Sequence, residues 1–170
     1  PLLRGYQFLS GKPVLYAWNC AEDEAAGYDL PEGKPGMVHI AVSAKLEREL
    51  AEIDEPEERE MFMADLGVTD SALDRVIGGT YELLGLISFL TAGDKEVRAW
   101  PVRAGSTAPE AAGVIHSDFQ KGFIRAEVIG YDDFLRAGDF KKAKELGVAR
   151  LEGKDYIVKD GDIIEFRFNV

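Results

Sequence analysis

Two short groups of polar residues have types and spacing that could support chemistry. Asn19 and Glu22 stand three residues apart, directly after the apolar run Pro13-Val14-Leu15-Tyr16-Ala17-Trp18. They offer an amide and a carboxylate at a strand end, although the pair alone favours a turn residue or a helix cap. The tripeptide His116-Ser117-Asp118 contains the residue types of a catalytic triad. Adjacent side chains point in divergent directions, and there is no nucleophile elbow, so a loop or capping role is favoured there.

The sequence contains no phosphate-binding loop. Gly-x-x-x-x-Gly-Lys-Ser/Thr does not occur, and stretches such as Gly33-Lys34-Pro35-Gly36 lack its spacing and its strand-to-helix setting. Without that loop, no backbone cradles phosphates and no hydroxyl is placed for Mg²⁺. No Cys/His cluster has zinc spacing, and His39, inside an apolar run, favours a packed core histidine over a ligand. We therefore expect no catalytic residue and no metal ligand in this chain.

Composition indicates a globular protein with one ordinary core or two small ones. Of 170 residues, 46% are hydrophobic and 30% are charged, and no apolar run approaches the length that spans a bilayer. The single cysteine, Cys20, fits a reducing compartment, so we expect a cytoplasmic protein with no membrane partner. The net charge of −11 argues against general coating of nucleic acid, and we expect no DNA partner. Most of that charge lies between Leu46 and Asp74.

The elements that must position the first group have clear signals. The apolar runs over 13–18 and 37–42 are typical of strands buried on both faces of a parallel sheet. A helix is predicted after Ser43-Ala44-Lys45, and a second one over 57–66 ends at a glycine. A third helix begins at Ser71, with its large apolar residues on one face. Gly78-Gly79 inside it predicts a close packing contact or a kink.

The last eighty or so residues have a different pattern. A strand over 97–100, the capping box Thr107-Ala108-Pro109-Glu110, a strand over 123–129 and a helix over 140–146 follow in turn. The runs 156–158 and 163–168 flank Asp160-Gly161, which predicts a terminal hairpin. Hairpins with short helices over this length are typical of an open α+β domain such as a β-grasp.

Several stretches in one order resemble a known family. They are Thr91-Ala92-Gly93, Glu96-Val97-Arg98-Ala99-Trp100, Thr107-Ala108-Pro109-Glu110-Ala111-Ala112-Gly113, Ile115-His116-Ser117-Asp118-Phe119, Lys121-Gly122-Phe123-Ile124-Arg125-Ala126-Glu127-Val128 and Gly153-Lys154-Asp155-Tyr156-Ile157-Val158. These are similar to the C-terminal TGS domain of the YchF-type, Obg-like ATPases, a branch of the translation-factor-related P-loop NTPases. The resemblance continues through Asp65-Leu66-Gly67 and Tyr81-Glu82-Leu83-Leu84, so it covers essentially the whole chain.

The resemblance implies three parts. Residues 1–45 would be an α/β remnant of the nucleotide-binding (G) domain of a P-loop NTPase, and residues 46–85 an acidic helical arm. Residues 86–170 would be an α+β, ubiquitin-like β-grasp domain, the TGS domain. In intact family members the phosphate loop and the switch histidine lie upstream of this region. The chain is therefore expected to be inactive alone, with ATP and Mg²⁺ as cofactors of the intact protein and neither bound to this piece.

The resemblance also gives Asn19-Cys20-Ala21-Glu22 a role. Family members carry Asn-x-x-Glu after a buried strand, where guanine-specific relatives carry Asn-Lys-x-Asp. Ser43-Ala44-Lys45 occupies the place of the second base-side loop, with Ser43 and Ala44 as the residues that bind the base. An Asn amide can accept from N6 of adenine and donate to N7. The Asp of the guanine-specific sequence accepts from two N–H groups that adenine lacks. The implied reaction is hydrolysis, with ATP preferred over GTP.

The implied partner is the ribosome, through its large subunit, or RNA, contacted by the TGS domain and the helical arm. The basic side of the last domain would be formed by Lys121, Arg125, Lys141, Lys142 and Lys144. One alternative is a non-catalytic β-grasp module that binds RNA or protein. Another is a TGS-containing GTP-binding protein of the Obg or DRG kind, which Glu22 disfavours because those proteins need Asp there.

Overall fold

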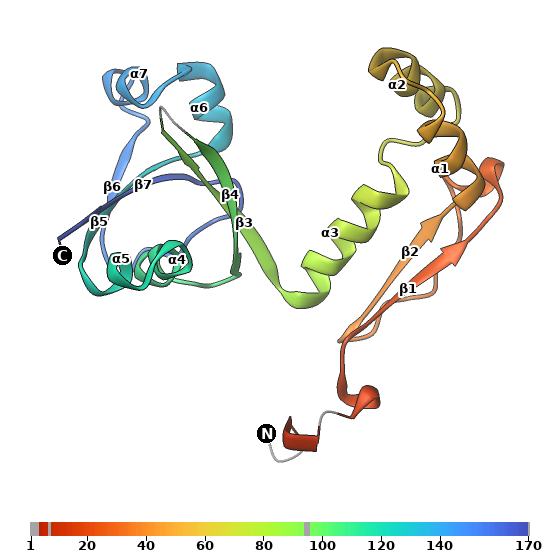
Figure 1. Cartoon of the computed structure of the whole chain (residues 1–170), viewed down its shortest axis with the longest axis horizontal. Coiled ribbons are helices and arrows are strands. Elements are labelled where there is room, and N and C mark those ends of the chain that lie inside the picture. The colour runs from red at the N-terminus through yellow and green to blue at the C-terminus, as the bar shows by residue number, and fades with distance from the viewer. Residues whose placement is uncertain (1–3, 7, 94–95, 170) are drawn as a thin grey trace. The chain divides into compact units, whose positions relative to one another are not determined.

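A computed structural model describes residues 4–6, 8–93 and 96–169, which fall into two compact units, Pro1–Leu84 and Gly85–Val170 (Figure 1). The first unit contains two strands and three α-helices: β1 (Val14–Asn19), β2 (Met37–Val42), α1 (Ala44–Ala51), α2 (Pro56–Asp65) and α3 (Ala72–Leu84). The acidic residues predicted as a separate segment over 46–85 thus pack in the same unit as β1 and β2, up to Leu84. None of the helices in the described ranges is long and apolar enough to cross a membrane.

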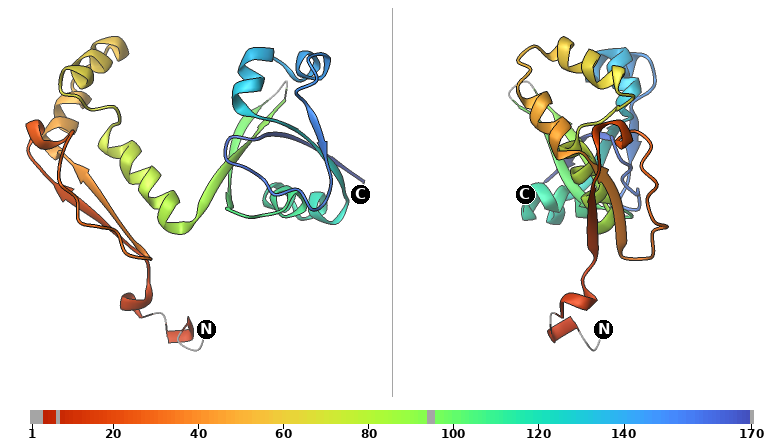
Figure 2. Two further views of the ribbon diagram at one scale, coloured as in Figure 1. Left: turned by 180° about the vertical axis from the view of Figure 1, so that it is seen from behind. Right: turned by 90° about the vertical axis from the view of Figure 1, so that its right-hand side faces the viewer.

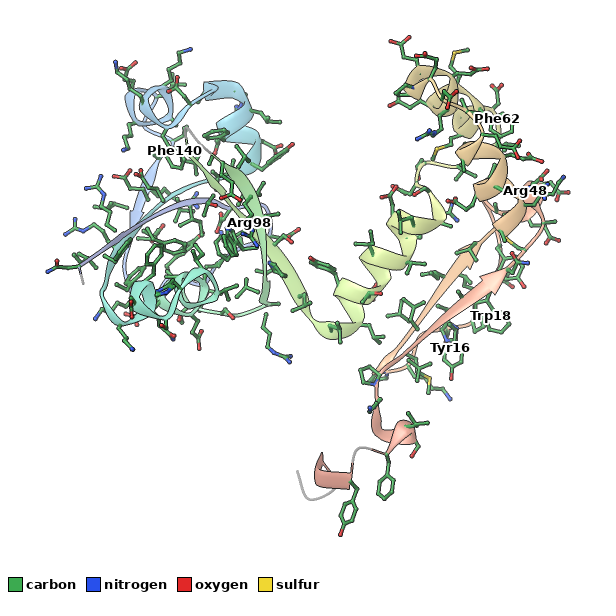
Figure 3. All side chains as sticks on the ribbon, viewed as in Figure 1. Tyr16, Trp18, Arg48, Phe62, Arg98 and Phe140 are labelled. Atoms are coloured by element: carbon green, nitrogen blue, oxygen red, sulfur yellow. The ribbon has the colours of Figure 1, made fainter. Side chains whose placement is uncertain are left out.

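The two strands of the first unit pair in parallel, as the apolar runs predict. The register joins Val14 to Met37 at one end and Asn19 to Val42 at the other. Helix α3 packs on one face, where Gly79 meets Leu15. The predicted burial of both faces is wrong for the described residues, because Tyr16 and Trp18 are 40% and 38% exposed. Figure 3 shows these two aromatic side chains on the side of the strands away from α3.

Helix α3 begins as the sequence predicts but packs by a different face. The Ser71 hydroxyl accepts a hydrogen bond from the backbone N–H of Asp74 at 3.1 Å, which caps the first turn. The large apolar residues Leu73, Ile77 and Leu84 are exposed in the described structure, whereas Gly79 is buried. A glycine lets the helix backbone approach the sheet closely. The close fit at Gly79, rather than the apolar pattern, therefore determines which face of α3 packs on the strands.

The second unit is built on a five-stranded sheet in the order β4-β3-β7-β5-β6. Its elements are β3 (Leu86–Ala92), β4 (Val97–Arg103), α4 (Ala108–Ile115), α5 (Ser117–Lys121), β5 (Phe123–Ile129), α6 (Tyr131–Ala137), α7 (Phe140–Glu145), β6 (Arg150–Glu152) and β7 (Ile163–Phe168). Helices α4 and α5 cover one face of the sheet, and α6 and α7 pack beyond its other face (Figures 1 and 2). The main core contains Phe89, Val128 and Ile164 beneath the alanines of α4.

The capping box at the start of α4 forms as predicted. The Glu110 carboxylate accepts from the backbone N–H of Thr107 at 2.7 Å and from its hydroxyl at 3.0 Å. These hydrogen bonds, the backbone one first, hold the pKa of Glu110 below its ordinary value.

The predicted terminal hairpin is wrong. Strand β7 lies between β3, with which it runs parallel, and β5, with which it runs antiparallel. Both of its edges are therefore occupied, and the segment over 156–158 pairs elsewhere. Val158 donates its backbone N–H to the carbonyl of Ser106 at 3.0 Å, and Tyr156 accepts from Ala108 at 2.9 Å. The turn between the two segments does form, with φ of +75° at Gly161.

Two buried acidic groups anchor this unit. Glu127 on β5 pairs with Lys144 at 2.5 Å and with Arg167 on β7. Burial opposes its ionisation, but the two cations outweigh burial and hold the pKa of Glu127 below its ordinary value. Asp162 accepts a 2.7 Å hydrogen bond from the hydroxyl of Tyr156. Burial, followed by this hydrogen bond, raises the pKa of Tyr156 to about 12.

The close approach of α3 to the strands gives the first prediction. A Cβ atom at Gly79 would lie 3.1 Å from Cδ1 of Leu15 and 3.2 Å from branched carbons of Val38 and Ile40. Gly79→Ala should therefore destabilise the first unit by about 1–3 kcal/mol. Backbone amide hydrogen exchange of β1 and β2 measures this loss.

The adjacent glycine is the control. A Cβ at Gly78 meets nothing within 4 Å. Gly78→Ala should stabilise the same amides by about 0.5–1 kcal/mol through helix propensity. Equal effects of the two substitutions would contradict the packing described for Gly79.

Candidate functional site

The carboxyl ends of β1 and β2 lie side by side, and each is followed by a polar loop. Asn19 pairs with Val42 in the register of the two strands, and the backbone N–H of Cys20 donates to the carbonyl of Val42 at 2.9 Å. Asn19 is exposed, and its Oδ1 accepts a 3.0 Å hydrogen bond from the backbone N–H of Ala44. The two predicted base-side loops are thus joined by a direct hydrogen bond.

Cys20 and Ser43 hold the loops from within. Ser43 is buried at the N-cap of α1, where its hydroxyl accepts from the backbone N–H of Leu46 at 3.4 Å. Cys20 is half-buried, and its thiol donates to the carbonyl of Val42 at 3.3 Å. The side chains of these two predicted site residues therefore form hydrogen bonds within the protein that stabilise the loops.

Glu22 and Lys45 form a second link between the same loops. Lys45 Nζ lies 2.7 Å from Oε1 of Glu22 and 3.7 Å from Oε1 of Glu49. The hydrogen bond that Lys45 donates to Glu22, followed by the negative charge of Glu22, raises the pKa of Lys45. Glu22 is the more sheltered partner, with 26% of its side chain exposed against 64% for Lys45. Lys45 ends the predicted base-side loop Ser43-Ala44-Lys45 but is not among the residues predicted to bind the base.

Helix α3 fixes the chain behind both loops. The Nη1 atom of Arg75 donates to the carbonyl of Ala25 at 3.2 Å and to that of Ala41 at 3.0 Å. Glu47 on α1 accepts from the backbone N–H of Ala72 at 2.6 Å. Ala25 follows the first loop by three residues and Ala41 precedes the second by two, so one guanidinium connects the segments that flank the two loops. No local pattern could have identified Arg75, because its acceptors are 50 and 34 residues away.

The predicted basic residues of the second unit do not form a single patch. Arg125 on β5 stands opposite Arg167 on β7 in the strand register. Glu127 follows Arg125 by two residues on β5, so all three side chains lie on one face of the sheet. Lys144 reaches this face through its ion pair with Glu127. Lys121 ends α5, a helix of the other face, and lies 3.9 Å from Asp118. Lys141 and Lys142 are exposed on α7.

The two histidines have structural contacts. His116 caps α5, since its Nδ1 accepts from the backbone N–H of Asp118 at 3.2 Å, which confirms the predicted capping role. Nδ1 of His39 accepts from Nε1 of Trp18 at 3.0 Å, and its ring stacks on Tyr16 at 4.9 Å. His39 is half-buried among these aromatic rings. Within the described residues, no group of three or more His, Cys, Asp or Glu side chains is placed to hold a metal ion.

Two parallel strands with polar loops at their carboxyl ends, followed by a separate α+β unit, define a mixed α/β protein. A family profile named YchF-GTPase_C, described as "Protein of unknown function (DUF933)", matches residues 86–169. The ribosome-binding ATPase YchF of Bacillus subtilis (strain 168) is 48% identical over 181 residues, covering 99% of this chain and 48% of that protein. The protein of that name from Pasteurella multocida (strain Pm70) is 51% identical over 175 residues, with the same coverage.

Solved structures give the same result. The Schizosaccharomyces pombe YchF GTPase has a TM-score of 0.78 at 31% identity, over 98% of this chain and 46% of that one. A GTP binding protein from Pyrococcus horikoshii OT3 shares the fold, with a TM-score of 0.61 at 23% identity over 93% and 46%. Residues 86–169 are therefore the C-terminal domain of the YchF family, and the chain is homologous to YchF proteins along its length. It spans about half the length of the curated relatives it matches.

The contacts of Arg75 give a second prediction. Arg75→Met leaves the carbonyls of Ala25 and Ala41 without their donor, which should destabilise the first unit by about 1–3 kcal/mol. Amide exchange in 22–25 and 41–44 should rise more than in the second unit. Arg48, an exposed arginine on α1, supplies the control Arg48→Met, which should leave these amides unchanged. A loss that is the same for both variants would exclude the role assigned to Arg75.

Proposed function

We propose that the chain is the base-recognition and partner-binding part of a cytoplasmic, ribosome-associated protein that hydrolyses ATP in preference to GTP. The observation that carries this proposal is the pair of loops over 19–22 and 43–45, held together at the carboxyl ends of two parallel strands. Ligands of α/β sheets bind at this edge. The relatives from Bacillus subtilis and Pasteurella multocida are named ribosome-binding ATPases, whereas the Schizosaccharomyces pombe structure is named a GTPase, so the base preference needs its own argument.

The hydrogen bond between Asn19 and Ala44 favours adenine. It commits one lone pair of Asn19 Oδ1 and identifies the amide nitrogen as the group that can donate to N7 of a purine. The same bond occupies the backbone N–H of Ala44, so that donor is not available to the O6 atom of guanine. A guanine in this site would therefore leave its carbonyl oxygen without a donor, which costs about 1–3 kcal/mol when the group is buried.

The residues of this chain bind and orient the base, and the phosphate chemistry belongs to residues outside it. The amide of Asn19 matches the donors and acceptors of adenine, whereas nothing in the sequence supplies a phosphate loop or the hydroxyl ligand that Mg²⁺ takes from one. Bound Mg²⁺ would neutralise the charge that develops on the transferred phosphoryl group. We expect the 170 residues alone to hydrolyse no nucleotide.

The sheet order supports a TGS, β-grasp assignment for residues 86–170. Two antiparallel strands, a helix that crosses one face, and a last strand inserted beside the first form the β4-β3-β7-β5-β6 order. Arg125 is exposed on the face of the sheet opposite α4, and α7 presents Lys141 and Lys142 to solvent. We propose this side as the surface that faces the ribosome or RNA, with phosphates as the groups it contacts. Lys144 contributes less, because Glu127 neutralises it.

A third prediction tests base preference. The segment of the Bacillus subtilis relative that aligns with this chain is replaced by residues 1–170, which restores the part that the chain does not cover. This chimera should bind Mg·ATP about tenfold or more tightly than Mg·GTP in calorimetry. Asn19→Ala should weaken ATP binding by about tenfold, because both the N7 donor and the link to Ala44 are lost. Equal affinities of the unsubstituted chimera for both nucleotides would refute the preference for ATP.

A fourth prediction tests the partner surface. The 170-residue chain should co-sediment with ribosomes at low salt, and the Lys141→Glu/Lys142→Glu double variant should lose roughly tenfold in affinity at 0.1 M salt. The exposed lysines Lys154 and Lys159 supply the matched control. The Lys154→Glu/Lys159→Glu double variant should lose less ribosome affinity than the α7 variant. If the α7 variant and the control variant co-sediment with ribosomes equally well, the surface on α7 is not the ribosome contact. Co-sedimentation by residues 86–170 alone would favour the alternative of a non-catalytic binding module.

A further inference from the structure

Lys45, at the start of α1, is the basic residue of the candidate site. Its ammonium group lies 2.7 Å from Oε1 of Glu22, and its neighbour Ala44 donates to Asn19. The first two residues of α1 thus engage the two ends of Asn19-Cys20-Ala21-Glu22. The contact to Glu49, on the next turn of α1 at 3.7 Å, holds the lysine over this loop.

The ion pair changes what Glu22 can accept. A carboxylate that recognises guanine accepts from N1–H and N2–H with its two oxygens, as a bidentate acceptor. In this structure Oε1 of Glu22 is committed to Lys45, and the negative charge that would attract those two donors is neutralised. Glu22 is also sheltered, so its carboxylate has less water to replace a lost partner than an open surface acid would have.

We propose that Lys45 is a specificity-determining residue: by holding Glu22 in an ion pair, it keeps the carboxylate from accepting the N1–H and N2–H groups of guanine. This inference rests on the proposed function, because it assumes that a purine occupies the edge formed by the two loops. Without Lys45, the freed carboxylate gains two donors from guanine and faces the N1 lone pair of adenine. Both changes shift the preference toward GTP.

The test uses the same chimera and measures the ratio of the dissociation constants for Mg·GTP and Mg·ATP. Lys45→Met should lower this ratio about tenfold, the equivalent of one hydrogen bond to a charged group. Lys45→Arg keeps the charge and the donor and should keep the ratio. Lys34, an exposed lysine of the loop before β2, supplies the control Lys34→Met, which should also keep the ratio.

A double variant separates the proposed route from a direct contact between Lys45 and the base. Glu22→Gln with Lys45→Met has no freed carboxylate, so it should show no gain in relative affinity for GTP. A gain that persists in the double variant, or a ratio unchanged within twofold in Lys45→Met, would overturn the inference. The unsubstituted chimera distinguishes the two levels: equal affinities there refute the ATP preference itself, whereas a preserved preference with an unresponsive Lys45 refutes only this role.

Discussion

The parallel pairing of β1 with β2 is the constraint on which the candidate site depends. Because parallel strands end at the same edge of a sheet, the register that joins Asn19 to Val42 places residues 19–22 beside residues 43–45, twenty-odd positions later in the chain. Every contact of the site follows from this placement, including the hydrogen bond from Ala44 and the ion pair between Glu22 and Lys45. Arg75 on α3 stabilises the same arrangement by donating hydrogen bonds to the backbone carbonyls of Ala25 and Ala41, which flank the two loops.

Local signals in the sequence predicted the elements well, and long-range contacts explain the failures. The strand over 37–42, the capping box at Thr107 and the cap at His116 each depend on residues within a few positions, and all of them form. The terminal hairpin failed because β7 found partners on both edges in β3 and β5, which no turn signal can indicate. The apolar face of α3 misled for a similar reason, since the close fit at Gly79 determined its orientation.

The candidate site shows the same division between what sequence can and cannot predict. Asn19, Glu22 and Ala44 were identified by their order and by resemblance, and the structure brings them to one edge, although their ligand remains a proposal. Cys20 and Ser43 were assigned to the base, whereas their side chains hydrogen-bond within the loops. In the second unit, an acid buried in β5 could not be identified from the sequence alone. Glu127 forms an ion pair with Lys144, so the charge of that lysine is neutralised within the fold.

The proposed function separates base recognition from phosphate chemistry, so this chain would carry base specificity without hydrolytic activity. Glycine-rich phosphate loops bind the part that all nucleoside triphosphates share, so they cannot distinguish adenine from guanine. Discrimination requires groups whose donors and acceptors are fixed before the base arrives, because an unmatched polar group costs most when its partner cannot move. In the proposed function, the links at Asn19 and Lys45 provide that fixation inside residues 1–84. Each would remove one feature that guanine needs: a free backbone donor for O6 and a free carboxylate for N1–H and N2–H.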